Sequence, residues 1–129
     1  MQFKIYISVE GPEFDPGALN AALADALKGT VRERKHLSEK SQNQRAYWES
    51  KERLITAGYP EDALLDLLAS YGPALLQVLA MGNGVKISTQ IIEEHSEVES
   101  PRGFFVSSQL VEALAKLRAD LDLDVICVS

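Results

Sequence analysis

The feature that most limits the possible folds is a strict alternation of apolar and polar residues over 3–10, FKIYISVE. The odd-numbered residues are apolar, and the residues between them are polar or amphipathic. The apolar residues are Phe3, Ile5, Ile7 and Val9. Successive side chains of a strand point to opposite faces, so this segment predicts a strand with one buried face. Such a strand needs a layer of other elements on one side of its sheet.

The next segment, GPEFDPGALNAALADALKG, carries the start and stop signals of a helix. Asp15 is a good N-cap, Pro16 suits the first helical position, and Phe14 is placed to pack against Leu19. An apolar stripe follows at helical spacing. Gly29 is predicted to end this helix.

The remaining elements follow from periodicity and turn signals. The leucine-rich 60–81 segment is helical, but Gly72-Pro73 predicts two short helices or one sharply bent helix, because proline removes a backbone donor. Ser107 or Ser108 is expected to cap the last helix. Strands are predicted at 30–36, 45–50, 85–95, 104–107 and 121–129, and helices at 60–81 and 108–119.

This order predicts one α+β domain over residues 1–129. Its first six elements match a ferredoxin-like βαββαβ core with a mainly antiparallel sheet and helices on one face. The C-terminal helix and strand would extend that layer and that sheet. Residues 30–50 are predicted to form a hairpin with a long polar turn.

The stretch MGNGVKIST, residues 81–89, contains the residue types of a phosphate-binding loop. Such a loop follows a strand and precedes the N-terminus of a helix. Here the glycines follow a helix and precede a strand, and a helix C-terminus repels anions. Gly82 and Gly84 are therefore interpreted as a helix stop and a turn.

No other pattern indicates catalysis, a cofactor or a metal. Cys127 lies in an apolar strand and is expected to fill space there. His36 and His95 lack a metal-ligand spacing such as HExxH. The acidic stretch EEHSEVE, residues 93–99, would at most hold a cation weakly. We expect no catalytic, cofactor-binding or metal-binding residues.

The uneven charge is the main indication of function. The net charge is −6, and residues 60–129 contain 11 acidic and 4 basic side chains. An acidic protein is a poor ligand for nucleic acid but attracts basic proteins. The alternative is that the acidic excess only maintains solubility. If there is a basic partner, the predicted contact residues are Glu93, Glu94, Glu97 and Glu99.

Tyr47 and Trp48 are neighbours in a predicted strand, so their side chains point to opposite faces. Trp48 is expected to pack against the helices. Tyr47 is then an exposed residue and a further candidate contact for a partner. The chain lacks the basic aromatic strand of RNA-binding ferredoxin-like domains.

The expected location is the cytoplasm. Met1 is followed directly by the first strand, so no secretory leader is expected. One cysteine forms no internal disulfide. No apolar run is expected to reach the roughly 20 residues of a membrane span, so no membrane association is expected.

Three stretches resemble the bacterial "domain of unknown function 4279" family: FDPGALNAALADAL, DALLDLLASYGPALLQVL and the tail GFFVSSQLVEALAKLRADLDLDVICV. The tryptophan in YWES belongs to the same pattern, and the resemblance covers nearly the whole chain. It implies a small bacterial α+β protein without an established enzymatic activity. No set of functional residues is implied by it.

Two classes of function are compatible with these observations. The first is an intracellular interaction protein, for example an immunity-type protein that occupies the active site of a toxin. The second is a small-molecule binder or an undetected enzyme, with a site between the sheet and the 30–50 hairpin. A deep pocket with convergent polar groups would favour the second class.

Overall fold

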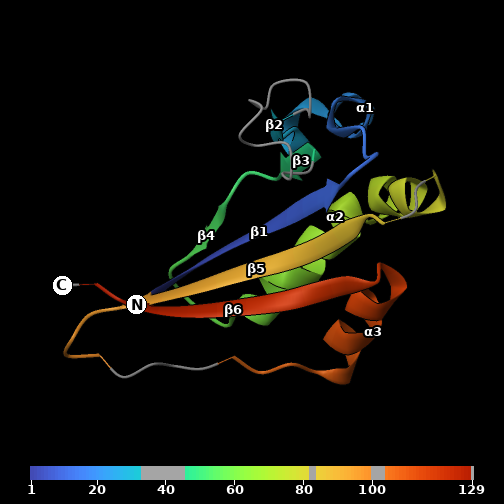
Figure 1. Cartoon of the computed structure of the whole chain (residues 1–129). Helices are drawn as coiled ribbons and strands as arrows, with labels where there is room; N and C mark the ends of the chain where they lie inside the picture. The colour runs from blue at the N-terminus through green and yellow to red at the C-terminus, as the bar shows by residue number, and fades with distance from the viewer. Residues whose placement is uncertain (33–45, 82–83, 100–103, 129) are drawn as a thin grey trace.

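The computed structural model describes residues 1–32, 46–81, 84–99 and 104–128. These residues form one sheet with α-helices packed against it (Figure 1). The strands are β1 (Gln2–Gly11), β2 (Thr30–Arg32), β3 (Ala46–Glu49), β4 (Arg53–Ile55), β5 (Lys86–His95) and β6 (Ala119–Cys127). The helices are α1 (Pro16–Ala22), α2 (Pro60–Met81) and α3 (Ser108–Lys116), with a 3-10 turn at Asp25–Leu27. The prediction of a single α+β domain is confirmed.

The long strand β1 lies at the centre of the sheet, whose order is β2-β3-β1-β5-β6. β5 is antiparallel to β1 along almost its whole length. On the other edge of β1, β3 pairs with Ser8–Gly11 and β4 with Phe3–Ile5, both antiparallel. β6 runs parallel to β5, so the sheet is mixed.

The core lies between one face of the sheet and the helices. The odd-numbered residues of β1 are all buried there, as the alternation predicts. Trp48 of β3 is fully buried and meets Tyr71 of α2 edge-on, with 5.5 Å between the ring centroids. Its indole N–H donates to Asn20 of α1 over 3.1 Å. Trp48 thus joins the sheet to two helices.

The N-cap prediction at the first helix is confirmed, but its predicted end is wrong. Asp15 accepts a hydrogen bond from the backbone N–H of Ala18 over 3.0 Å. α1 ends at Ala22, and a separate 3-10 turn precedes Gly29. A Cβ atom at Gly29 would lie 2.0 Å from the carbonyl oxygen of Glu49. Gly29 therefore allows a close approach to β3, rather than ending a helix.

Residues 60–81 form one helix with Pro73 inside it, so of the two predicted alternatives the pair of short helices is wrong, and the alternative of a single helix bent at Gly72-Pro73 stays a prediction. The buried stripe of Leu67, Leu68, Tyr71 and Leu75 continues across the proline. Packing of this stripe on the sheet therefore outweighs the missing backbone hydrogen bond. Gly72 has no neighbouring atom near its Cβ position, so nothing crowds the chain at this point.

α2 also qualifies the expectation that no segment is long and apolar enough to span a membrane. By length and composition alone, this 22-residue helix meets that description. In the structure, its stripe from Leu64 to Leu75 is buried against the sheet and the other helices.

Three further segments differ from the sequence-based expectation or lie beyond the described residues. Residues 104–107 contain no strand, and lead directly to α3, which Ser107 caps through a hydrogen bond from the backbone N–H of Leu110. β4 follows β3 after a short break and was not predicted. Residues 33–45, most of the predicted hairpin turn, lie outside the described residues.

Candidate functional site

One face of the sheet is not covered by any helix in the described part of the chain, and we call it the open face. It carries the even-numbered residues of β1, β5 and β6, and strand register places Arg32, Tyr47 and Glu49 on the same side. Its polar and charged members are Gln2, Lys4, Tyr6, Ser8, Glu10, Thr30, Arg32, Tyr47, Glu49, Lys86, Ser88, Gln90, Glu94, Asp120, Asp122 and Asp124.

The open face is acidic. Among these residues, six are carboxylates and three are cations. Lys4 is paired with Glu94 over 2.9 Å, and Lys86 lies 4.0 Å from Asp120. Within the described residues, Asp122 and Asp124 form no ion pair. Glu10 and Glu49 likewise form no ion pair within the described residues, so unpaired carboxylates lie on β1, β3 and β6.

This row of aspartates was not selected by the sequence-based prediction of the site. The signal was present in the LDLD repeat, where leucine and aspartate alternate over residues 121–124. Alternation on a strand sends all the aspartates to one face. The location of that face, beside the tyrosines of the central strands, depends on the pairing of β6 with β5.

Tyr47 lies on the open face, opposite to the buried Trp48, as predicted, but it is half-buried rather than exposed. Its hydroxyl donates a hydrogen bond to Glu49, and the guanidinium carbon of Arg32 lies 5.1 Å from the centroid of its ring. Burial and this hydrogen bond raise the pKa of Tyr47. Burial also raises the pKa of Tyr6, with further contributions from Glu49, Glu52, Asp124 and Asp122. Both phenols are therefore neutral hydrogen-bonding groups on an anionic surface.

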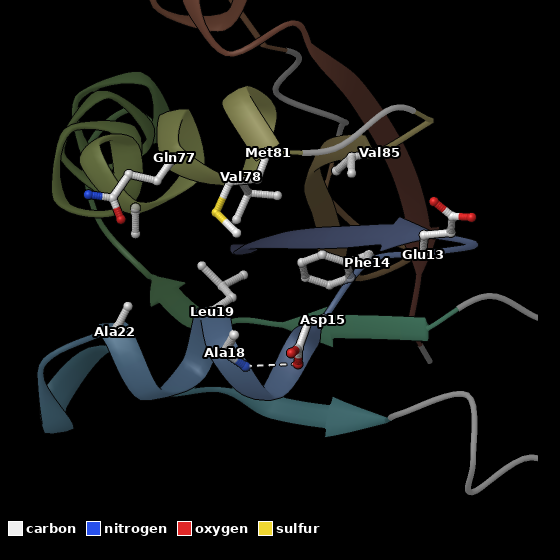
Figure 2. Close-up of a pocket in the computed structure, with 11 residues that line it drawn as sticks. Glu13, Phe14, Asp15, Ala18, Leu19, Ala22, Gln77, Val78, Met81 and Val85 are labelled. Atoms are coloured by element: carbon white, nitrogen blue, oxygen red, sulfur yellow. Dashed lines mark hydrogen bonds between the residues drawn. The ribbon is translucent and has the colours of Figure 1, made fainter.

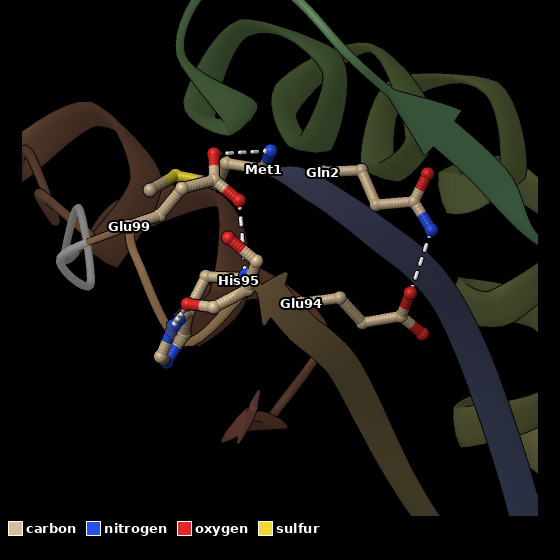
Figure 3. A network of polar contacts seen from close by, with 6 residues as sticks. Met1, Gln2, Glu94, His95 and Glu99 are labelled. Carbon is tan, nitrogen blue, oxygen red and sulfur yellow. Dashed lines mark hydrogen bonds and ion pairs between the residues drawn. The ribbon is translucent and has the colours of Figure 1, made fainter. Parts of the chain in front are cut away.

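Two of the four predicted glutamates hold the start of β1 in place (Figure 3). Glu94 accepts a hydrogen bond from Gln2 and pairs with Lys4, and these contacts lower its pKa. Glu99 accepts hydrogen bonds from the amino group of Met1 over 2.7 Å and from the backbone N–H of Ser96 over 2.9 Å. These contacts lower the pKa of Glu99 to about 2.

The other two predicted glutamates are in opposite environments. Glu93 is fully buried on the helix side of the sheet, opposite Phe3. Glu97 is exposed in the turn that follows β5. Of the four glutamates, only Glu94 shares the open face with Tyr47, and register places these two residues at opposite ends of β1. The expectation that all four carboxylates are spare surface charges does not match their contacts.

A pocket of about 270 Å³ lies on the other side of the molecule, between α1 and the second half of α2 (Figure 2). Its walls are mainly apolar, from Leu19 of α1 and Val78 of α2. Glu13 and Gln77 supply polar groups, while the carboxylate of Asp15 is occupied with its cap. This is not the predicted location between the sheet and the 30–50 hairpin.

The cysteine and the described histidine, the residues considered for catalysis or metal binding, do not form a site with other described side chains. Cys127 is exposed at the end of β6, so the prediction that it fills space is wrong. The Nδ1 atom of the His95 ring contacts the carbonyl oxygen of Ser96 over 2.9 Å. Among the described residues there is no group of three metal-ligating side chains. His36 lies outside the described residues.

Comparison with protein-family models, with curated proteins and with solved structures gives no significant match to this chain.

Proposed function

We propose that this protein is a binding module without catalytic function, and that its acidic open face holds a basic protein partner. The observation that carries the proposal is the row Asp120, Asp122 and Asp124 on a sheet face that no described helix covers. A sheet face lined by carboxylates attracts cationic surfaces and repels phosphates, so a basic protein fits it better than a nucleic acid.

The tyrosines support this proposal. Aromatic side chains contribute strongly to protein interfaces because they bury a large area and keep a polar group at the tip. Tyr6 and Tyr47 are half-buried on the open face near the carboxylates. A partner with lysine or arginine side chains would meet both anionic oxygens and ring faces there.

The setting of this function is part of the proposal. The resemblance to the "domain of unknown function 4279" family supports a small bacterial protein, and we propose the cytoplasm as its location. One concrete form is an immunity protein that covers the active site of a basic toxin. Such an inhibitor needs a complementary surface but no reactive groups of its own.

We also propose that the first elements are a variant of the ferredoxin-like unit. If β3 and β4 are treated as one interrupted strand, the order around β1 and all neighbouring directions in this part of the sheet follow the split unit. β6 then extends the sheet in parallel beside β5. The open face would be the face that such domains commonly use for binding.

The test is affinity capture from the native host, with three forms of the protein. One form has Asp120, Asp122 and Asp124 changed to asparagine. The matched control removes three exposed charges from the helix side, at Glu13, Asp62 and Glu112. A basic protein retained by the wild type and the control, lost from the triple asparagine form and released by salt supports the proposal. Capture that is the same in all three forms contradicts it.

The pocket between α1 and α2 favours a second candidate function, the binding of a small apolar molecule. Its volume of about 270 Å³ is close to the lower limit for ligand sites, roughly 300 Å³. Ala18→Phe would fill the pocket from α1 without changing the open face. Saturable binding of the neutral dye Nile red that is lost in Ala18→Phe, but kept in the triple asparagine form, supports this candidate. Equal dye binding by both variants excludes the pocket.

A further inference from the structure

The outer edge of β6 has backbone groups without a described partner. β6 pairs with β5 on one side, and it is the last strand of the sheet. The backbone N–H of Val128 donates to the carbonyl oxygen of His95 over 2.8 Å. The backbone N–H and C=O groups of the even-numbered β6 residues therefore point toward β5. Because N–H and C=O groups alternate along a strand, those of Leu121, Leu123, Val125 and Cys127 point to the outer edge.

The two faces of this edge differ sharply. On the open face lies the aspartate row, and all three of these residues are exposed. On the helix side, Leu123 is 41% exposed and Val125 is 49% exposed. Of the β6 residues, the partly buried Ala119 and Leu121 pack against the core. Beyond Leu121, the edge is anionic on one face and apolar on the other.

A second copy of the chain does not fit this edge. Antiparallel self-pairing in any register that joins the two apolar sides would also place the two aspartate rows side by side. Like charges opposite each other destabilise paired strands. The same aspartates would strongly favour a strand with lysine or arginine at alternate positions, because its cations would lie beside them.

We propose that the outer edge of β6 binds an extended segment of the partner as an added antiparallel strand, in which apolar residues alternate with lysine or arginine. This inference rests on the proposed function and specifies how the basic partner is held. The backbone groups at Leu121, Leu123 and Val125 would give affinity, and the alternation would give specificity. The added apolar side chains would cover Leu123 and Val125.

The probe is a fluorescein-labelled peptide of seven residues with alternating lysine and valine. Its comparators are a peptide with alternating glutamate and valine, a peptide with the lysines and valines in separate blocks, and the first peptide with N-methylated valines. In the proposed pairing, the valines face the outward groups of β6, so N-methylation removes the hydrogen bonds but keeps the charges. We expect each comparator to bind at least about tenfold more weakly in fluorescence anisotropy.

The matching change in the protein is Leu123→Pro, with Leu123→Ala as its control. Both remove the leucine side chain, but only proline also removes the outward N–H, which makes no bond to β5. We expect Leu123→Pro to lose peptide binding about tenfold relative to Leu123→Ala. Peptide binding should also slow hydrogen exchange at the amides of Leu123 and Val125 in the wild type. This measurement and the N-methylated peptide keep the test valid even if the proline variant does not fold.

The outcomes separate this inference from the proposed function. Binding that needs the aspartates but is indifferent to N-methylation and to Leu123→Pro places the partner on the open face and overturns the edge proposal alone. Equal binding of the lysine and glutamate peptides, unaffected by the triple asparagine change, overturns both. Concentration-dependent dimers that protect the Leu123 amide without peptide assign the edge to a second copy and also overturn the inference.

Discussion

At the scale of single residues, the structure separates side chains that stabilise the fold from those available to a partner. Glu94 and Glu99 look similar to Glu97 in the sequence, yet they hold the first strand against β5 and its turn. Glu97 remains exposed. Three predictions belong to this scale.

Asp15→Ala should lower the free energy of unfolding by about 1 kcal/mol, because the backbone N–H of Ala18 loses its capping oxygen. Urea denaturation followed by circular dichroism measures this change. Asp15→Asn keeps a capping oxygen and should stay close to the wild type. Equal losses in both variants would show that the cap is not the cause.

Glu99 should make stability depend on pH in the acid range. Its folded pKa is about 2, below the ordinary value of 4.5, so its contribution is complete above pH 4.5 and is lost as the pH falls toward 2. In thermal unfolding of a chain whose first residue is Met1, Glu99→Gln should melt lower at pH 6 and converge with the wild type near pH 2. A difference that is constant over this range would contradict the assignment.

Cys127 should react with a thiol reagent in the folded protein, because its side chain is exposed at the end of β6. Labelling with 5,5′-dithiobis(2-nitrobenzoic acid) before and after urea denaturation tests this expectation. Comparable rates in the two states support it. Protection that disappears only on unfolding would instead support the sequence-based expectation of a shielded thiol.

At the scale of elements, the instructive case is α2. The Gly72-Pro73 pair predicts either two short helices or one bent helix, and the structure has one helix through it. Tertiary packing outweighs the low helix propensity of this pair, because Tyr71 and Leu75 lie on either side of it and both belong to the core. The predicted strand at 104–107 is wrong for a different reason. Its apolar FFV run has the composition of a strand, but it lacks a described neighbouring strand to pair with.

Pro73→Ala should stabilise the protein. Pro73 is exposed, so its side chain contributes little packing, and alanine restores the backbone donor within the helix. A proline inside a helix is about 3 kcal/mol less favourable than alanine, so we expect a gain of roughly 1–3 kcal/mol in urea denaturation. Gly72→Ala serves as a comparison, with an expected gain of about 1 kcal/mol or less. A loss of stability in Pro73→Ala would show that the proline fits a local geometry that alanine does not.

At the scale of the whole molecule, the helices form a single layer on one face of the sheet, and no described helix covers the other face. Trp48 connects the sheet to this helical layer, since it contacts α1 through Asn20 and α2 through Tyr71. The charges collect on the other side, where the carboxylates of β6 come beside the polar residues of β5 and β1.

Trp48→Ala should cost about 3–5 kcal/mol, because it leaves a cavity in the core and frees the Asn20 contact. Trp48 is the only tryptophan of the chain, so unfolding must be followed by circular dichroism rather than by fluorescence. Tyr47→Ala, its neighbour on the open face, should cost much less. Equal losses would mean that the two faces of β3 are equally important to the fold.

The sequence by itself determined the local features: the alternation of β1, the caps at Asp15 and Ser107, the inward Trp48 and the helical stripe of α2. These follow from interactions between residues close in the chain, whose spacing is visible in the sequence. Only the tertiary structure decided that Glu93 is buried, that Cys127 is exposed and that the aspartates of β6 extend the open face. Those outcomes depend on which strand lies beside which and on where α3 ends, and such long-range pairing leaves no periodic signal in the sequence.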